Sequence, residues 1–265
     1  MVFLSSADST TKWEGARLGT RLYNALHTAL CSHFADPSAD PLERLFTGNA
    51  YYASKQTTKN PDTFKILSQG QTPQILWIGC ADSRIPETTV CHCKPGDIFV
   101  HRNIANTIHP DDYNAASVVE YAVTHLKVDK VVVCGHTKCG GAMASLTDVD
   151  LGETLNRWLQ PLRAYVRYYE PDSFLRTHLT KSRLRRKHWA ELKPLSDDAR
   201  AARVAELNVH QSVDVLEQHP AIKKAMLERE LTTHGLIYNL ATGQLKILEQ
   251  SDYKVSCDEA IQDNM

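Results

Sequence analysis

Two short apolar runs constrain the fold of this chain more than any other feature. Residues 74–79 read Gln-Ile-Leu-Trp-Ile-Gly, and residues 130–135 read Lys-Val-Val-Val-Cys-Gly. Short apolar runs that end at glycine are typical of strands buried on both faces of a sheet. Between them, residues 112–126 place apolar side chains at helical spacing. Strand, helix and strand in this order predict a βαβ unit with a parallel sheet.

The rest of the pattern extends this unit to an α/β fold, with a mostly parallel central β-sheet flanked by helices. Leucines at steps of four within residues 13–33 predict an N-terminal helical arm. Polar residues at about 171–195 predict an insertion, and the overall charge balance favours a solvated segment over a contact for acidic partners. The other expected elements are strands at 97–100, 232–240 and 244–249, and helices at 41–53, directly after 60–61, at 151–169 and at 196–218.

Opposite charges are nearly balanced in the composition. Thirty Lys and Arg residues stand against 31 Asp and Glu residues, which excludes the broad positive field typical of nucleic-acid-binding proteins. No apolar run approaches the roughly 20 residues of a membrane helix, so we expect neither a nucleic-acid nor a membrane partner. The start of the chain lacks the features of a secretory signal, and a cytoplasmic location is expected. A mitochondrial location is the alternative, because Ser and Thr precede Lys12, Arg17 and Arg21.

Chemically reactive residues directly follow both apolar runs. Cys80 begins the segment Cys-Ala-Asp-Ser-Arg, and the second run leads into His136-Thr-Lys-Cys139-Gly-Gly. If both strands are parallel neighbours, Cys80, His136 and Cys139 converge at one edge of the sheet. Two thiolates and one imidazole leave one tetrahedral position of Zn²⁺ open, which is typical of catalytic zinc. Taken alone, each half is better explained as a buried thiol or as a loop histidine beside a core thiol. The case for a metal site comes from both halves standing at equivalent strand ends.

Two further features near these residues allow more than one interpretation. Asp82 and Arg84 either form an ion pair that holds a turn, or they supply a carboxylate acceptor and a guanidinium that fixes its direction. The run Cys91-His92-Cys93 has the residue types of a metal site. Adjacent positions on one turn rarely enclose a single ion, so no metal is predicted there. The seven cysteines are scattered and odd in number, which predicts reduced thiols.

These motifs together resemble the β-class carbonic anhydrases. Cys-x-Asp-x-Arg is followed, from His136 on, by His-x-x-Cys-Gly-Gly, and the segments 95–106 and 120–123 also look like this family. The resemblance implies one Zn²⁺ per subunit, held by Cys80, His136 and Cys139, with Asp82 and Arg84 as catalytic residues. The implied activity is the reversible hydration of carbon dioxide to bicarbonate and a proton, a lyase reaction.

The resemblance also implies a substrate pocket and an assembly. Gln71 matches the family's amide donor to substrate, and the Gly140 N–H matches a bicarbonate contact. Phe99, Ile104 and Tyr121 match residues that line the carbon dioxide pocket, although core packing explains the same side chains. In this family the pocket lies at a subunit interface. We therefore expect a homodimer or homotetramer, an oligomerisation arm at 1–59 and a zinc-binding catalytic domain at 60–265.

One subgroup of the family suggests two further expectations. Trp77, Arg102 and Tyr238 match a non-catalytic pocket in which bicarbonate favours an inactive state; a core tryptophan and a surface ion pair are the alternative. In the same subgroup the aspartate can ligate zinc. Asp82 is therefore expected to be a conditional fourth ligand, which leaves Arg84 and closes the site as the pH falls.

Two other functions fit the same residues. The first is hydrolysis of carbon disulfide or carbonyl sulfide on the same scaffold. The second is a non-catalytic zinc-binding or redox-sensing protein. The pair of Asp82 and Arg84 argues against the second, because a purely structural zinc site would more naturally contain a fourth protein ligand.

Overall fold

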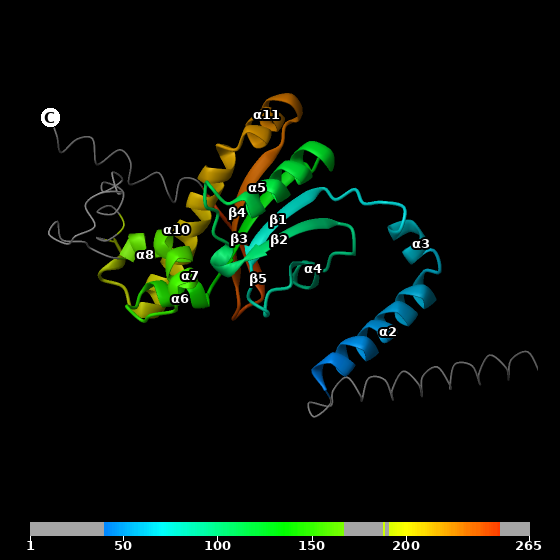
Figure 1. Ribbon diagram of the computed structural model, residues 1–265, viewed down its shortest axis with the longest axis horizontal. Coiled ribbons are helices and arrows are strands. Elements are labelled where there is room, and N and C mark those ends of the chain that lie inside the picture. The colour runs from blue at the N-terminus through cyan, green and yellow to red at the C-terminus, as the bar shows by residue number, and fades with distance from the viewer. Residues whose placement is uncertain (1–39, 167–187, 189–190, 250–265) are drawn as a thin grey trace, which may run out of the picture. The chain divides into compact units, whose positions relative to one another are not determined.

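The computed structural model describes residues 40–166, 188 and 191–249 (Figure 1). The chain divides into two compact units, Met1–Gly70 and Gln71–Met265. The described part of the first unit contains helices α2 (Pro41–Lys59) and α3 (Thr63–Leu67). The helix predicted at 13–33 and most of the predicted insertion lie outside the described residues.

The residues at the start of helix α2 explain why the helix begins there. The side chain of Asp40 accepts hydrogen bonds from the main-chain N–H groups of Leu42 and Glu43, and proline occupies the first helical turn. The helix runs past the predicted end at residue 53. Tyr52 and Phe64 meet edge to face, with ring centroids 6.3 Å apart, so α3 packs against α2. The role of this unit in oligomerisation stays a prediction.

The second unit is built on a sheet whose described strands lie in the order β2-β1-β3-β4-β5. All pairings are parallel except that of β4 with β5, which confirms the predicted mostly parallel sheet. The chain passes from β1 to β2 on one side and returns to β3 on the other. Ligands of open α/β sheets bind outside the carboxyl ends of strands at such a reversal. The strands are β1 (Ile75–Cys80), β2 (Ile98–Asn103), β3 (Lys130–His136), β4 (Thr232–Asn239) and β5 (Gln244–Leu248).

Helix α10 (Asp197–Glu217) covers one face of the sheet at β3 and β4. Its close approach requires glycine in both strands. A Cβ atom on Gly135 would lie 2.8 Å from a methyl of Val209, and one on Gly235 would lie 2.9 Å from the other methyl. The main core fills this interface, whereas the opposite face carries a smaller cluster around Trp77.

Among the remaining helices, some lie at predicted positions with differences in detail, and others were not predicted. The helix expected at 112–126 consists of α5 (Tyr113–Glu120) and a π-helical turn, Tyr121–His125. The one expected at 151–169 is divided into α7 (Glu153–Trp158) and α8 (Gln160–Val166). The sequence did not predict α4 (Glu87–Val90), the 3₁₀ turn Ile104–Asn106, α6 (Gly140–Ser145) and α11 (Pro220–Arg229).

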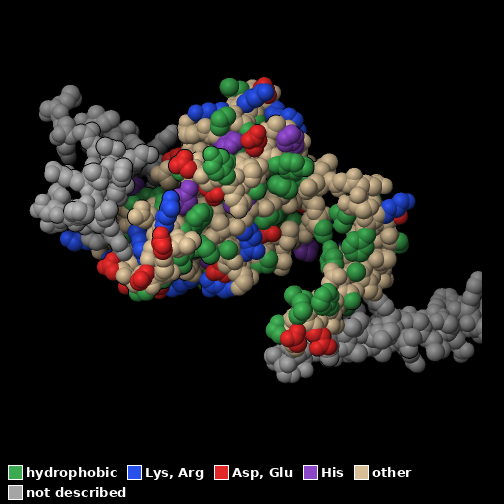
Figure 2. Space-filling model, viewed as in Figure 1, with side chains coloured by type: hydrophobic (Ala, Val, Ile, Leu, Met, Phe, Trp, Pro, Cys, Tyr) green, Lys and Arg blue, Asp and Glu red, His purple; other side chains and the backbone are tan. Residues whose placement is uncertain are grey.

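The surface agrees with the balanced composition. On the face drawn in Figure 2, Lys and Arg side chains are interspersed with Asp and Glu side chains. Among the described helices, none is both long and apolar enough to cross a membrane.

Candidate metal centre and active site

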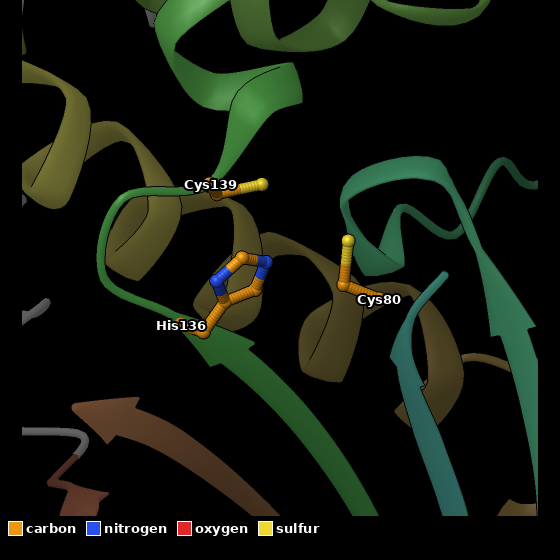
Figure 3. Close-up of side chains that lie close together, drawn as sticks. All are labelled: Cys80, His136 and Cys139. Carbon is orange, nitrogen blue, oxygen red and sulfur yellow. The ribbon is translucent and has the colours of Figure 1, made fainter. Parts of the chain in front are cut away.

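Three buried side chains converge at the carboxyl ends of two neighbouring strands. Cys80 is the last residue of β1, His136 is the last residue of β3, and Cys139 directly precedes α6. One ligand atom from each lies within 4.8 Å of those of the other two. Figure 3 shows the three side chains pointing toward one another. Within the described ranges, this is the only cluster of its kind that could hold a metal ion.

The hydrogen bonds of His136 leave one ring nitrogen ready for a ligand role. Nδ1 lies 2.9 Å from the carbonyl oxygen of Thr137, and a carbonyl only accepts, so Nδ1 carries the proton. Nε2 is buried and has no hydrogen-bond partner among the described residues. A buried ring nitrogen without a partner is costly unless it binds something. Its lone pair fits a metal ion between the sulfur atoms.

The two thiols suit the same ion. The Cys139 thiol beside Cys80 lowers the pKa of Cys80 below its ordinary value, although burial opposes this shift. Cys80 and burial in turn raise the pKa of Cys139. The pair therefore holds one negative charge readily, and a cation between the sulfurs would favour loss of the second proton. Two thiolates and one imidazole form a ligand set that suits Zn²⁺.

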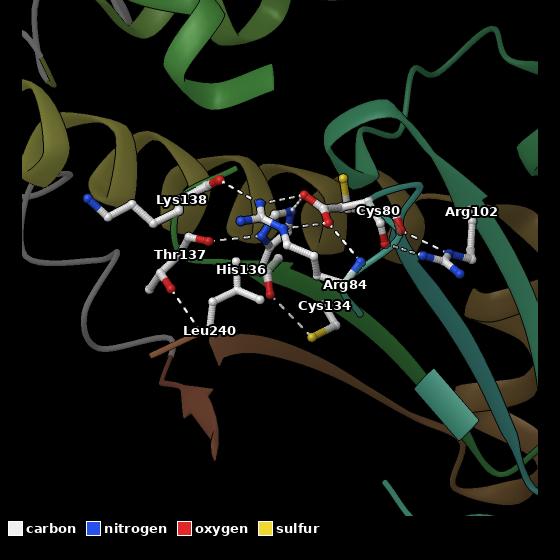
Figure 4. Close-up of polar contacts among 10 residues, drawn as sticks. Cys80, Arg84, Arg102, Cys134, His136, Thr137, Lys138 and Leu240 are labelled. Carbon is white, nitrogen blue, oxygen red and sulfur yellow. Dashed lines mark hydrogen bonds and ion pairs between the residues drawn. The ribbon is translucent and has the colours of Figure 1, made fainter. Parts of the chain in front are cut away.

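A loop with a left-handed residue brings Cys139 back beside His136. Lys138 has φ of +56° and reverses the chain between the two ligands. Thr137 fastens this loop to the end of β4. Its N–H donates to the main-chain carbonyl oxygen of Tyr238, and its hydroxyl accepts from the N–H of Leu240, which directly follows β4, both at 3.0 Å (Figure 4).

Asp82 lies beside the ligands and is held by Arg84. Arg84 Nε donates to Asp82 Oδ1 at 2.9 Å, and Nη2 donates to Oδ2 at 2.7 Å. This bidentate contact holds the pKa of the Asp82 carboxyl well below its usual range. Oδ2 of Asp82 lies 3.9 Å from Nε2 of His136. The predicted dyad is therefore formed, and its carboxylate faces the metal ligands.

Comparison with known proteins identifies the family. A family model described as carbonic anhydrase matches residues 75–245. The β-carbonic anhydrase CafA of Aspergillus fumigatus is 42% identical, with a TM-score of 0.71 over 84% of this chain and 96% of that chain. This chain belongs to the β-carbonic anhydrase family.

Other members cover the chain to a similar extent. A carbonic anhydrase of Candida albicans is 33% identical over 249 residues, which are 93% of this chain and 79% of that protein. One of Emericella nidulans is 36% identical over 208 residues, or 78% and 82% of the two chains. One of two tetrameric β-carbonic anhydrases of Sordaria macrospora is 40% identical, with a TM-score of 0.69 over 78% of this chain and 96% of that chain.

Two of the predicted substrate residues of this carbonic anhydrase lie close to Cys139. Gly140 is the first residue of α6, and a Cβ atom there would meet no other atom within 4 Å. Ile104 lies against Gly141, and its carbonyl oxygen accepts a 2.8 Å hydrogen bond from Trp158 Nε1. The side chain of Ile104 remains 44% exposed. Both residues are therefore positioned to border the metal centre.

The other predicted pocket residues are not brought to Cys80 of their own chain. Phe99 and Tyr121 lie together, with ring centroids 5.8 Å apart. Phe99 pairs with Leu76 in the sheet, which lies about 13 Å along β1 from Cys80 at about 3.3 Å per residue. Gln71 is exposed and precedes β1. Their role in binding substrate stays a prediction, and it requires the metal centre of a second subunit.

The residues of the predicted second bicarbonate site have other neighbours in the subunit. Trp77 and Tyr238 pack into one apolar cluster. Arg102 donates to the main-chain carbonyl oxygens of Cys80 and Asp82, and its guanidinium approaches Glu87. The second bicarbonate site itself stays a prediction.

Sequence reasoning gave no role to Glu87 or to Asn208, although Asn208 lies in a segment, 206–209, that loosely resembles the family. Glu87 is a buried acid beside Arg102, and Asn208 on α10 donates to the carbonyl oxygen of Ala105, which has φ of +61°. No local pattern distinguishes such residues from surface ones. Cys91 and Cys93 do not join a metal-ligand group within the described residues.

Proposed function

We propose that this protein is a zinc-dependent carbonic anhydrase that interconverts carbon dioxide with bicarbonate and a proton, one Zn²⁺ acting in each subunit. One observation carries the proposal. Nε2 of His136 is buried beside two cysteine sulfurs and has no hydrogen-bond partner within the described residues, and an ionised carboxylate lies 3.9 Å away. A structural metal site has no need of that carboxylate, whereas a hydration site does.

The roles of the residues follow from their positions. Cys80, His136 and Cys139 would hold the zinc ion, which would supply a Lewis acid that makes water nucleophilic near neutral pH. Asp82 is ionised and can only accept a hydrogen bond, so it orients a water molecule with its oxygen lone pair toward carbon dioxide. Arg84 keeps both oxygens of Asp82 in place.

The start of α6 provides a contact for the product. The first N–H groups of a helix have no acceptor within the helix. The N–H of Gly140 is in this position, next to the ligand Cys139. We infer that it donates to an oxygen of bicarbonate. The open space around Gly140 leaves room for that anion.

The active site is proposed to be completed in a homodimer or homotetramer. Tyr121 and Ile104 are 47% and 44% exposed, and Phe99 lies far from Cys80 of its own chain. Among the described strands, β2 lies at the edge of the sheet and pairs with β1 alone. Leu42, Leu45 and Phe46 of α2 are 60% to 71% exposed, as in an arm that packs on a partner. Light scattering after size-exclusion chromatography measures the oligomeric state. A monomer that remains fully active would contradict the proposal.

Stopped-flow measurement of carbon dioxide hydration tests the function. We expect catalysis by the purified protein, loss of it after zinc is removed with a chelator, and its return with added zinc. Parallel assays with carbonyl sulfide and carbon disulfide separate the activity from hydrolysis of those substrates. A zinc-loaded protein that hydrolyses carbonyl sulfide but does not hydrate carbon dioxide would refute the assignment.

A further inference from the structure

We propose that Arg102 is a positioning residue for the metal centre, because its guanidinium fixes the main chain that carries Cys80 and Asp82. This inference rests on the proposed metal site. Arg102 lies near the end of β2, opposite Gly79 of β1. It holds the backbone of the Cys80–Asp82 turn, whereas Arg84 holds the side chain of Asp82.

The contact uses two donors of one rigid group. Arg102 Nε donates to the carbonyl oxygen of Cys80 at 2.9 Å, and Nη2 donates to the carbonyl oxygen of Asp82 at 2.6 Å (Figure 4). The guanidinium is planar, so two such bonds fix both the distance and the orientation of the turn. The two carbonyls flank Ala81, and the Arg102 guanidinium bridges this residue.

The sheet does not hold this turn by itself. Register between β1 and β3 ends at Gly79 and Cys134. On the other side, the Ala81 N–H donates to the carbonyl of Asn103 at 2.8 Å, which is the last ladder bond of the strand. The carbonyls of Cys80 and Asp82 are therefore oriented by a side chain of the neighbouring strand. A displaced turn would move both the Cys80 sulfur and the Asp82 carboxylate.

Glu87 supports the guanidinium from the remaining side. Its carboxylate Oε2 lies 3.8 Å from Arg102 Nη1 and has no hydrogen-bond partner among the described residues. Glu87 is only 8% exposed, so its charge depends on Arg102 for compensation. Glu87 begins α4, five residues after Asp82. Attraction between the Glu87 carboxylate and the guanidinium keeps Arg102 from swinging toward solvent.

Arg102→Lys is the decisive variant. Lysine keeps the charge but presents its donors from one atom, so it cannot reproduce the planar fork. Changes to residues that orient metal ligands typically weaken metal binding about 10- to 100-fold. We expect the zinc affinity of the full-length Arg102→Lys protein, measured by competition with a chromogenic chelator, to fall about 10-fold. The absorption bands of its cobalt-substituted form should shift, because the ligand geometry changes.

Arg229→Lys is the matched control. Arg229 also donates to main-chain carbonyls, those of Val128 at 2.6 Å, Val123 at 3.0 Å and Lys127 at 3.4 Å, but it lies outside the metal centre. Both variants should lower Tm. Only Arg102→Lys should alter the zinc affinity and the cobalt spectrum. Glu87→Gln removes the charge and keeps the shape. It should change the zinc affinity and the cobalt spectrum in the same direction as Arg102→Lys, by a smaller amount.

The outcomes are separable from those for the proposed function. If Arg102→Lys folds and keeps wild-type zinc affinity and cobalt spectrum, Arg102 has no positioning role. If that variant does not fold, Glu87→Gln decides, since a spectrum identical to wild type would also refute the inference. A wild-type protein that binds zinc but does not hydrate carbon dioxide would refute the function and leave this comparison intact.

Discussion

The guanidinium of Arg84 reaches the carbonyl oxygen of Lys138 at 3.1 Å and thereby joins the two loops that carry the metal ligands. The same Nη2 atom holds Asp82. Arg84 thus fixes the carboxylate relative to Cys139 as well as to Cys80.

Replacing Arg84 with lysine should lower kcat/KM about 10- to 100-fold with zinc content unchanged, because lysine cannot serve both loops and the carboxylate. Stopped-flow rates and elemental analysis measure the two quantities. Asp198→Asn removes the exposed ion pair of Asp198 with Lys138 near the same loop, and it should leave the rate close to wild type. Equal rates in wild type and Arg84→Lys would contradict this role.

The conditional ligation of zinc by Asp82 gives a second prediction. Its Oδ2 lies 3.9 Å from His136 Nε2 but is paired with Arg84. Arg84→Ala frees the carboxylate, and X-ray absorption should then report a carboxylate oxygen in the zinc shell more often than in wild type. If the spectrum of Arg84→Ala is identical to that of wild type, the state in which Asp82 ligates zinc is excluded.

The second bicarbonate site suggested by the family resemblance can be tested away from Arg102. Tyr238 is partly buried in the cluster with Trp77. If bicarbonate binds there, Tyr238→Phe should show weaker inhibition by bicarbonate than wild type in initial-rate assays, with Tyr52→Phe as the control. Identical inhibition of all three proteins would count against the site.

Gly135 and Gly140 should respond oppositely to alanine. A Cβ atom on Gly135 would lie 2.8 Å from Val209 and 3.0 Å from Ile237, and such overpacking costs about 1–3 kcal/mol. Gly140 has open space and starts a helix, so Gly140→Ala should leave stability unchanged or slightly higher. Urea denaturation measures the free energy of unfolding of both variants. A Gly135→Ala protein as stable as wild type would show that α10 does not press on β3 as described.

The sequence was sufficient to predict the elements with strong, local patterns. The apolar runs around Trp77 and Val132 identified β1 and β3, and the parallel order then brought Cys80 near His136. Helix α11 was not predicted because its pattern is weak: Leu227 is 89% exposed, and the helix buries only Ile222 and Ala225.

Hydrogen bonds from side chains to the main chain could not be predicted from the sequence. Every residue has a main-chain carbonyl, and any of them can accept a hydrogen bond. The sequence around Arg102 therefore does not indicate that its guanidinium holds the turn of Cys80 and Asp82. The motif match to Phe99 likewise does not say which subunit's metal centre this residue would border. Only the register with Leu76 shows that it is distant from Cys80 of its own chain.

Zinc content per chain is the most direct test of the central claim. Elemental analysis of purified wild-type protein should give one zinc per subunit, and Cys80→Ser, His136→Ala and Cys139→Ser should each lose most of it. Cys93→Ser, a cysteine outside the metal-ligand group, should keep the wild-type content. Full zinc occupancy in all three ligand variants would contradict the account.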